Sequence, residues 1–173
     1  MVLFIVLFLI CFIGYYLHTL WHYQQYKGIG FKQRGKLFNV YTHIIVFAGY
    51  LAYGFMIYTD PFKIDINLTM RISGLIVGIA GIIIVALATI KKKGYTEPDS
   101  LIESGIYSIM RNPMYFGIIL IHIGLPLFFG SIITLLSAFI WIPLIILWKH
   151  WEEKCLERKF GEKYIAYKRR TLF

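Results

Sequence analysis

Residues 114–148 read MYFGIILIHIGLPLFFGSIITLLSAFIWIPLIILW, an apolar segment without any Asp, Glu, Lys or Arg. Gly130 and Ser131 break this segment near its middle. Each piece is shorter than, or close to, the roughly 20 residues that a helix needs to cross about 30 Å of hydrocarbon. We therefore predict a hairpin of two apolar helices that turns at this dipeptide.

The composition indicates that the rest of the chain also lies in a membrane. Of the 173 residues, 58% are hydrophobic and 16% are charged, and the mean hydropathy is +0.67. Soluble domains carry about 25% charged residues. Apolar runs at about 2–21, 38–58 and 70–90 add three spans, so we predict an all-α integral membrane protein of about five transmembrane helices. The first run has no basic start and no small-residue cleavage site, and we interpret it as a retained helix rather than a signal peptide.

The distribution of charge predicts the orientation. The loop after the first span carries four basic residues, the loop after the third span four and the tail eight, which together are 16 of the 18 Lys and Arg residues. With five spans these segments share one side, which the positive-inside bias makes cytoplasmic. We expect the N-terminus outside and the C-terminus at the cytoplasmic face. The formal net charge of +9 then reflects topology and attraction to anionic lipid rather than nucleic-acid binding.

We expect a single domain over residues 1–173. Residues 1–90 form its three-helix membrane part, and residues 91–173 comprise a polar loop, the hairpin and a C-terminal helix. Apolar residues recur at three- and four-residue spacing after Trp151, which predicts an amphipathic helix with a break at Gly161. The chain's two cysteines lie at opposite ends of the sequence and suggest neither a disulfide nor a metal site.

Polar motifs flank the predicted hairpin. Before it stand Gly105-Ile106-Tyr107 and Arg111-Asn112-Pro113-Met114-Tyr115-Phe116-Gly117, and after it follow Glu152-Glu153 and Phe160-Gly161-Glu162-Lys163-Tyr164-Ile165-Ala166-Tyr167. In this order the motifs resemble the integral membrane methyltransferases of the isoprenylcysteine carboxyl methyltransferase and phospholipid N-methyltransferase group. The resemblance covers about residues 100–170, whereas the first three helices resemble the group only in hydropathy.

The resemblance implies an enzyme that uses S-adenosylmethionine, bound by the loop 91–113 and the residues after the hairpin. Its acceptor is lipidic or membrane-dissolved, either the carboxylate of a prenylated cysteine-like compound or the amine of a phospholipid, and is methylated at the cytoplasmic face. Arg111 and Glu153 are implied to be catalytic, and Arg170 to contact the substrate. The implied cofactor-binding residues are Tyr107, Arg111, Asn112, Tyr115, Gly117, Glu152 and Glu153. Asn112 departs from the usual histidine of the group, and the sequence after Arg170 lacks the proline-containing segment of the isoprenylcysteine enzymes.

The chemistry of this cofactor fits the same residue types. Arg111 can pair bidentately with the cofactor carboxylate. Glu152 or Glu153 can meet the ammonium group or the ribose hydroxyls, and Tyr107 and Tyr115 can cover the adenine or the sulfonium. These residues together form the candidate site.

The acceptor determines which further groups are needed. An amine must first lose a proton, for which Glu153 or His150 is the nearest candidate base, whereas a carboxylate needs only a cation such as Arg170. His18 and His22 have a spacing that can ligate a metal. We expect them at the outer interface without a carboxylate nearby, and we predict no metal site.

Two other classes stay open. Membrane sterol-type reductases resemble this C-terminal architecture and use NAD(P)H, so cofactor preference discriminates between the two enzymes. A non-enzymatic small membrane protein with a degenerate motif predicts no cofactor binding. The individual motifs also have structural explanations, because Arg-Asn-Pro is common at helix starts and Glu152-Glu153 can form surface ion pairs. His43 and His122 lie in or near spans, where we expect them to hydrogen-bond between helices.

Overall fold

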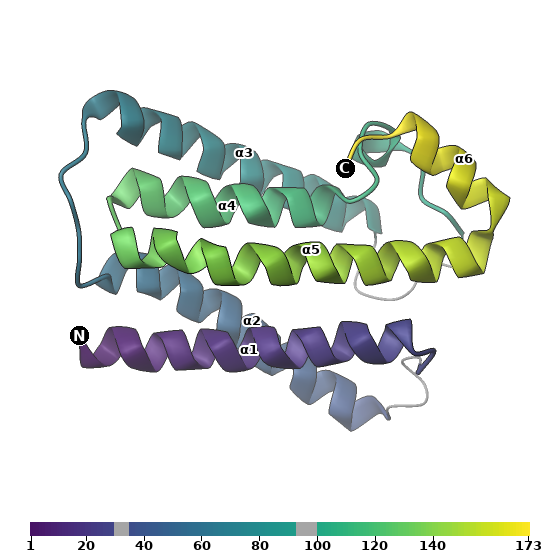
Figure 1. Cartoon of the computed structure of the whole chain (residues 1–173), viewed down its shortest axis with the longest axis horizontal. Coiled ribbons are helices and arrows are strands. Elements are labelled where there is room, and N and C mark those ends of the chain that lie inside the picture. The colour runs from purple at the N-terminus through teal and green to yellow at the C-terminus, as the bar shows by residue number, and fades with distance from the viewer. Residues whose placement is uncertain (30–34, 93–99) are drawn as a thin grey trace.

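The structure, a computed structural model, describes residues 1–29, 35–92 and 100–173. Within these ranges the chain is mainly helical, and Figure 1 shows most of the long helices running roughly lengthwise, with one crossing them obliquely. The elements are α1 (Val2–Tyr26), α2 (Lys36–Thr59), α3 (Leu68–Lys92), the short 3-10 helix η1 (Gly105–Ser108), α4 (Pro113–Phe129), α5 (Ile132–Phe160) and α6 (Glu162–Arg170).

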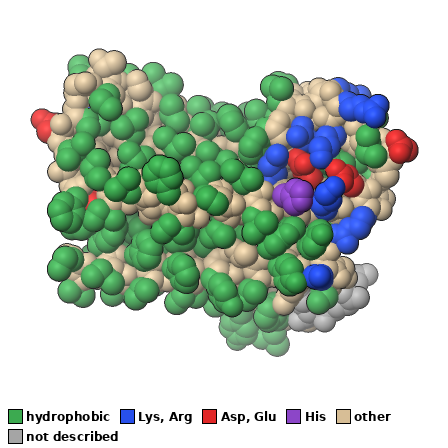
Figure 2. Space-filling view, viewed as in Figure 1, with side chains coloured by type: hydrophobic (Ala, Val, Ile, Leu, Met, Phe, Trp, Pro, Cys, Tyr) green, Lys and Arg blue, Asp and Glu red, His purple; other side chains and the backbone are tan. Residues whose placement is uncertain are grey.

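The helices form a membrane bundle with one charged end. Four helices of the described residues, α1, α2, α3 and α5, are long and apolar enough to cross a membrane, and α4 is a shorter apolar helix. Hydrophobic side chains cover most of the face seen in Figure 2, and charged side chains gather at the end that carries α6. The predicted all-α membrane fold with about five transmembrane helices is therefore confirmed. Lys32, Arg34 and Lys93, which the sequence assigns to the charged side, lie outside the described residues.

The predicted break at Gly130-Ser131 is confirmed. Gly130 ends α4 with a φ of 66°, a left-handed conformation that glycine adopts without strain. The turn is docked on the end of α2, because the Ser131 hydroxyl donates a hydrogen bond to the Ile57 carbonyl (2.6 Å). Asp60 accepts hydrogen bonds from the Thr134 backbone N–H (2.7 Å) and hydroxyl (2.8 Å). A buried carboxylate after α2 thus caps the start of α5.

Glycines bring the helices into close contact. A Cβ atom built on Gly124 of α4 would lie 2.3 Å from the Gly78 nitrogen of α3, and one built on Gly117 would lie 2.7 Å from the Gly81 carbonyl oxygen. Small residues of this kind let helix backbones approach one another in a bilayer. As a result, α3 packs along α4, while α1 packs on α2 and α5 joins the two pairs through α1 and α4.

The C-terminal part folds back over the charged end. Helix α5 continues without interruption to Phe160, so the expected amphipathic helix begins as the last turns of α5 rather than as a separate element. Gly161, with a φ of 53°, then breaks the helix as predicted, and α6 turns back toward the start of α4 (Figure 1). Tyr164 and Tyr167 supply the buried face of α6. The single-domain organisation stays a prediction.

Candidate active site

A cavity of about 1010 Å³ lies between the α1–α2 pair and the α3–α4 pair. One part of it is apolar and is lined by Phe47, Val85, Ile118 and Ile121. Its charged lining residues come from the end of the bundle where α3 stops, α4 starts and α5 continues toward α6. The polar lining residues that the sequence singles out are Tyr107, Arg111, Asn112, Tyr115 and Glu152. The cavity therefore joins an apolar chamber to a charged mouth.

Glu152 is the carboxylate of the cavity wall. Its Oε2 accepts a hydrogen bond from the Tyr115 hydroxyl, and its Oε1 lies 3.1 Å from the ammonium nitrogen of Lys92. The three residues come from α5, α4 and α3 respectively. This cluster fixes a negative charge at the mouth and holds the Tyr115 ring against the cavity.

The neighbouring Glu153 has a different environment. It is buried and is not among the cavity-lining residues. Its Oε1 accepts hydrogen bonds from Nε of Arg111 (2.8 Å) and Nδ2 of Asn112 (2.7 Å), and Lys149 lies 3.4 Å away. Its Oε2 lies 3.1 Å from Lys168 of α6, whose pKa is raised by its hydrogen bonds to Glu157 and Glu153. Glu153 thus ties the start of α4 to α5 and α6.

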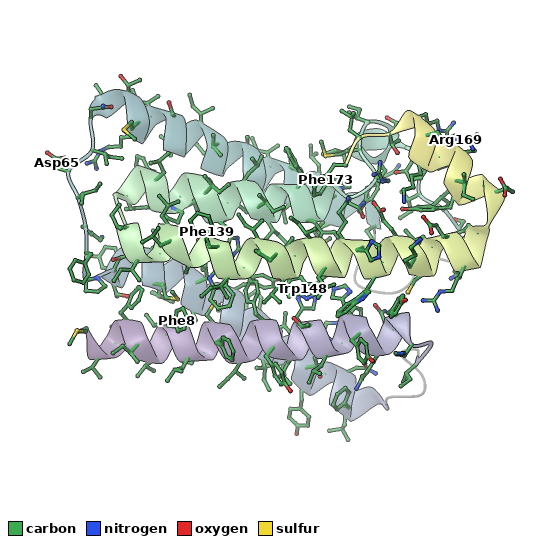
Figure 3. The ribbon with its side chains drawn as sticks, in the orientation of Figure 1. Phe8, Asp65, Phe139, Trp148, Arg169 and Phe173 are labelled. Carbon is green, nitrogen blue, oxygen red and sulfur yellow. The ribbon has the colours of Figure 1, made fainter. Side chains whose placement is uncertain are left out.

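The last residues complete this connection. The Arg111 guanidinium donates from Nη1 to the Thr171 carbonyl (2.8 Å), and the Arg111 backbone N–H donates to the Leu172 carbonyl (3.0 Å). Asn112 also donates to the Phe173 carbonyl (3.0 Å), and Figure 3 shows Phe173 beside the start of α4. Asn112 therefore acts as a hydrogen-bond donor here, a role that needs no titratable ring.

Tyr107 of η1 forms another wall of the cavity. The hydroxyl of Tyr167 on α6 donates to the Tyr107 carbonyl (2.7 Å), which fixes η1 against α6. Burial raises the pKa of Tyr167 to about 12 and holds the pKa of Tyr107 well above its usual range. Both phenols therefore stay neutral near pH 7, and neither acts as a base there.

The structure separates some residues that the sequence groups together. Gly117 faces α3, where it permits close helix packing, and it is not a cavity-lining residue. Arg170 is exposed and forms an ion pair with Glu103, and neither residue lines the cavity. His150, a candidate base, is exposed and also lies outside the lining. Neither Gly117 nor Arg170 lines the cavity, and their expected contacts, with the cofactor and the substrate respectively, stay predictions.

Histidines supply a part of the site that the sequence reasoning missed. His18, His22, His43 and His122 all line the cavity. The expectation that His18 and His22 lie far from any carboxylate is wrong, because Nε2 of His22 is 3.4 Å from the Tyr115 hydroxyl that binds Glu152. His122 does hydrogen-bond between helices as expected, to the Tyr15 hydroxyl at 2.6 Å. Among the described residues no group of His, Cys, Asp and Glu side chains is arranged to hold a metal ion.

Comparison with known proteins gives one match. A family model described as phospholipid methyltransferase matches residues 69–163, which is more than half of the chain. No curated protein and no solved structure matches. The matched range starts at the second residue of α3 and includes Arg111, Tyr115, Glu152 and Glu153, whereas α1 and α2 precede it.

Proposed function

The chain belongs to the phospholipid methyltransferase family, and from this membership we propose that it transfers the methyl group of S-adenosylmethionine to the amine of a phospholipid headgroup. It is a multi-pass membrane methyltransferase. The observation that carries the proposal is the Lys92–Glu152–Tyr115 cluster at the mouth of a 1010 Å³ cavity that continues into an apolar chamber.

The residues at the mouth match the groups of S-adenosylmethionine. Glu152 offers a carboxylate for the cofactor's ammonium or ribose hydroxyls, and Arg111 and Lys92 offer positive charge for its carboxylate. Tyr107 and Tyr115 present aromatic surface to the adenine or the sulfonium. When bound, the cofactor supplies an electrophilic methyl group on a positively charged sulfur. The chain binds, orients and shields the reactants from water.

Glu153 takes a supporting place in this proposal rather than a place on the cofactor. Its two oxygens are already bonded to Arg111, Asn112 and Lys168. It orients Arg111 and Asn112 at the start of α4, so we assign it as a positioning residue. Asn112, which lines the cavity, has its amide nitrogen directed at Glu153 and the Phe173 carbonyl.

The aromatic side chains around the cavity favour an amine over a carboxylate acceptor. Arg170, the cation that the resemblance implies for a carboxylate acceptor, is instead paired with Glu103 and is not a cavity-lining residue. The aromatic and histidine side chains of the α1–α2 wall carry no permanent positive charge that would repel an ammonium. Aromatic faces also attract ammonium groups, methylated ones included.

The orientation follows from the same charges. The cavity mouth lies at the end of the bundle that carries Lys92, Arg158 and α6. Lys63 and Arg71 are the basic residues of the opposite end, at the connection between α2 and α3 and at the start of α3. By the positive-inside bias we assign the mouth to the cytoplasmic face and the N-terminus to the outer face.

The test is methyl transfer in proteoliposomes. The purified chain is reconstituted with phosphatidylethanolamine, and the label of methyl-tritiated S-adenosylmethionine is followed into lipid. The proposal predicts labelled mono-, di- or trimethylated headgroups, and no labelling in vesicles made only of phosphatidylcholine, whose nitrogen has no proton to replace. Labelling of a prenylated cysteine analogue instead, with none of the amine lipid, would assign the carboxylate acceptor and refute the amine.

A further inference from the structure

The segment Thr171–Phe173 follows α6 and lies outside the family match, which ends at residue 163. It pairs with the loop before α4. The Leu172 backbone N–H donates to the Ile109 carbonyl (2.9 Å), and the Arg111 backbone N–H donates to the Leu172 carbonyl (3.0 Å). Figure 1 shows the segment running from α6 toward the start of α4. Two backbone hydrogen bonds thus join it to the loop that carries Arg111, which we assign to the cofactor carboxylate.

Both ends of the segment are anchored to helices. At one end Thr171 is buried, and its hydroxyl donates to the Tyr167 carbonyl of α6 (2.9 Å). At the other end the ring of Phe173 lies 5.4 Å between centroids from Phe116 of α4, and the Lys149 ammonium of α5 lies 4.5 Å from the Phe173 ring centroid. Aromatic and cation–π contacts of this kind stabilise the ring in its place. The position of the segment is therefore set by three helices.

The segment also contacts the Arg111 side chain. Nη1 of Arg111 donates to the Thr171 carbonyl (2.8 Å) and Nε donates to Glu153 (2.8 Å), so two acceptors on different elements fix the plane of the guanidinium. A guanidinium has five N–H donors. In the part of the chain that the structure describes, no acceptor is bonded to Nη2 of Arg111. Because Arg111 lines the cavity, its remaining donors can serve an anion bound there.

The Thr171 carbonyl orients Arg111 without cancelling its charge. Glu153 is the carboxylate that pairs with Arg111, but it is shared with Lys149 (3.4 Å) and Lys168 (3.1 Å), of which Lys168 has a further carboxylate partner. Three cations therefore surround one carboxylate. Positive charge is left over for a ligand carboxylate, whereas a second carboxylate in place of the Thr171 carbonyl would remove it.

We propose that the segment Thr171–Phe173 is a positioning element of the cofactor site. It holds the Arg111 guanidinium in the orientation in which the remaining N–H donors meet the carboxylate of S-adenosylmethionine. This inference rests on the proposed function, which supplies the cofactor. Without the segment, Arg111 keeps its charge and its bond to Glu153 but gains rotational freedom, which it must lose again when the carboxylate binds. The cost falls on cofactor affinity and not on the transfer step.

The test compares Leu172→Pro with Leu172→Ala. Proline removes the N–H that bonds Ile109, and the extended Thr171 (φ −122°, ψ 150°) already has the conformation that a residue before proline prefers. Alanine keeps the N–H and removes only a side chain of a residue that is 67% exposed. We expect calorimetry of the detergent-purified chains to give a Kd for S-adenosylhomocysteine about two- to tenfold weaker in Leu172→Pro than in Leu172→Ala, the range that ordering one side chain costs.

Decarboxylated S-adenosylhomocysteine separates positioning from general damage, because it keeps the ammonium and lacks only the carboxylate. Its Kd should be the same in both variants. In proteoliposomes of phosphatidylethanolamine, Leu172→Pro should likewise raise the KM for S-adenosylmethionine and leave kcat nearly unchanged. Structural damage, in contrast, would weaken both ligands alike or lower kcat through loss of folded enzyme.

A second pair of variants loosens the other end of the segment. Phe173→Ala removes the ring that packs on Phe116, and we expect it to weaken binding of S-adenosylhomocysteine as Leu172→Pro does, whereas the conservative Phe173→Tyr keeps the ring and should restore the affinity. Equal affinities for S-adenosylhomocysteine in Leu172→Pro and Leu172→Ala would overturn the inference, as would an equal loss for the decarboxylated ligand or a fall in kcat at constant KM. If the unsubstituted chain binds no S-adenosylhomocysteine, the proposed function itself fails.

Discussion

Substitution of Glu153 by Gln is expected to destabilise the fold, whereas the same substitution at Glu152 is expected to weaken cofactor binding. The two residues are adjacent, but their partners differ. Glu153 is enclosed by Arg111, Asn112, Lys149 and Lys168, while Glu152 lies on the cavity wall. Identical substitutions at neighbouring positions therefore separate structural support from ligand contact.

The magnitude follows from burial. Arg111 and Glu153 are 14% and 7% exposed at their side chains, and breaking such a buried pair costs about 3–5 kcal/mol. Lys168 is 36% exposed, so solvent screens its ion pair with Glu153, and loss of that pair adds little to the cost. Gln keeps one carbonyl oxygen for Arg111 or Asn112, which places the expected loss near about 3 kcal/mol. At about 2–4 °C per kcal/mol for a chain of this size, Tm should fall by about 6–12 °C.

The assay can use the chain's own cysteine. Cys11 is fully buried in α1, so a thiol-reactive fluorescent dye labels it only when the bundle opens. The half-buried Cys155 is replaced by Ser in all samples to remove its background. In this background Glu153→Gln should unfold at the lower temperature, and Glu152→Gln should change the free energy of unfolding by only about 1 kcal/mol.

Cofactor affinity gives the second half of the comparison. Loss of a charge-assisted contact of about 1.5–3 kcal/mol corresponds to about a ten- to hundredfold weaker Kd for S-adenosylhomocysteine in Glu152→Gln. Glu153→Gln, measured well below its Tm, should lose less affinity than Glu152→Gln. The reverse pattern, with a stable Glu153→Gln that no longer binds and an unstable Glu152→Gln that does, would refute this division of roles.

Two further substitution pairs test the fold. Gly124→Ala should cost more than about 3 kcal/mol and largely prevent folding, because the new methyl would lie 2.3 Å from the Gly78 backbone. The control Gly54→Ala, whose new methyl would have nothing within 4 Å, should leave Tm unchanged. Equal melting temperatures of the two variants would show that α3 and α4 do not pack this closely. Asp60→Ala should cost about 1–3 kcal/mol because it uncaps α5, whereas Asp65→Ala, at a side chain that is 99% exposed, should melt like the unsubstituted chain.

The membrane fold could be predicted from local features of the sequence. Apolar length identifies the spans, and Gly130 and Gly161 mark breaks because each occupies a left-handed φ. The continuation of α5 to Phe160 could also be inferred, since no Gly or Pro stands between Trp148 and Phe160. The sequence reasoning instead divided the helix where its polarity changes, although polarity alone does not end a helix.

The roles of the two glutamates could not be predicted from their adjacency. Successive residues on an α-helix point about 100° apart, so one member of the pair can face a cavity while the other points away from it. Which one does so depends on how α5 is rotated against α1 and α4, and that is set by packing at distant residues such as Trp141 and Trp148. The role of Gly117 was equally hard to predict, because a glycine in a helix can make room either for a ligand or for a neighbouring helix.

The histidines could have been found from the topology itself. The predicted orientation, with the N-terminus outside, puts the end of the first span near His22 on the same predicted inner side as the loop that contains Arg111. The sequence reasoning placed His18 and His22 at the outer interface and so separated them from Tyr115. Arg170 was beyond sequence reasoning, because its partner Glu103 is 67 residues away along the chain.

The most direct test of the account is a calorimetric titration of the detergent-purified chain with S-adenosylhomocysteine, with NADPH in a parallel titration and Glu152→Gln as the matched variant. The account predicts saturable binding of S-adenosylhomocysteine that weakens about ten- to hundredfold in Glu152→Gln, and no binding of NADPH. Binding of NADPH alone would place the chain with the reductases and contradict the account. Binding of neither ligand by a chain that melts cooperatively would contradict it as well, and would favour a non-enzymatic membrane protein.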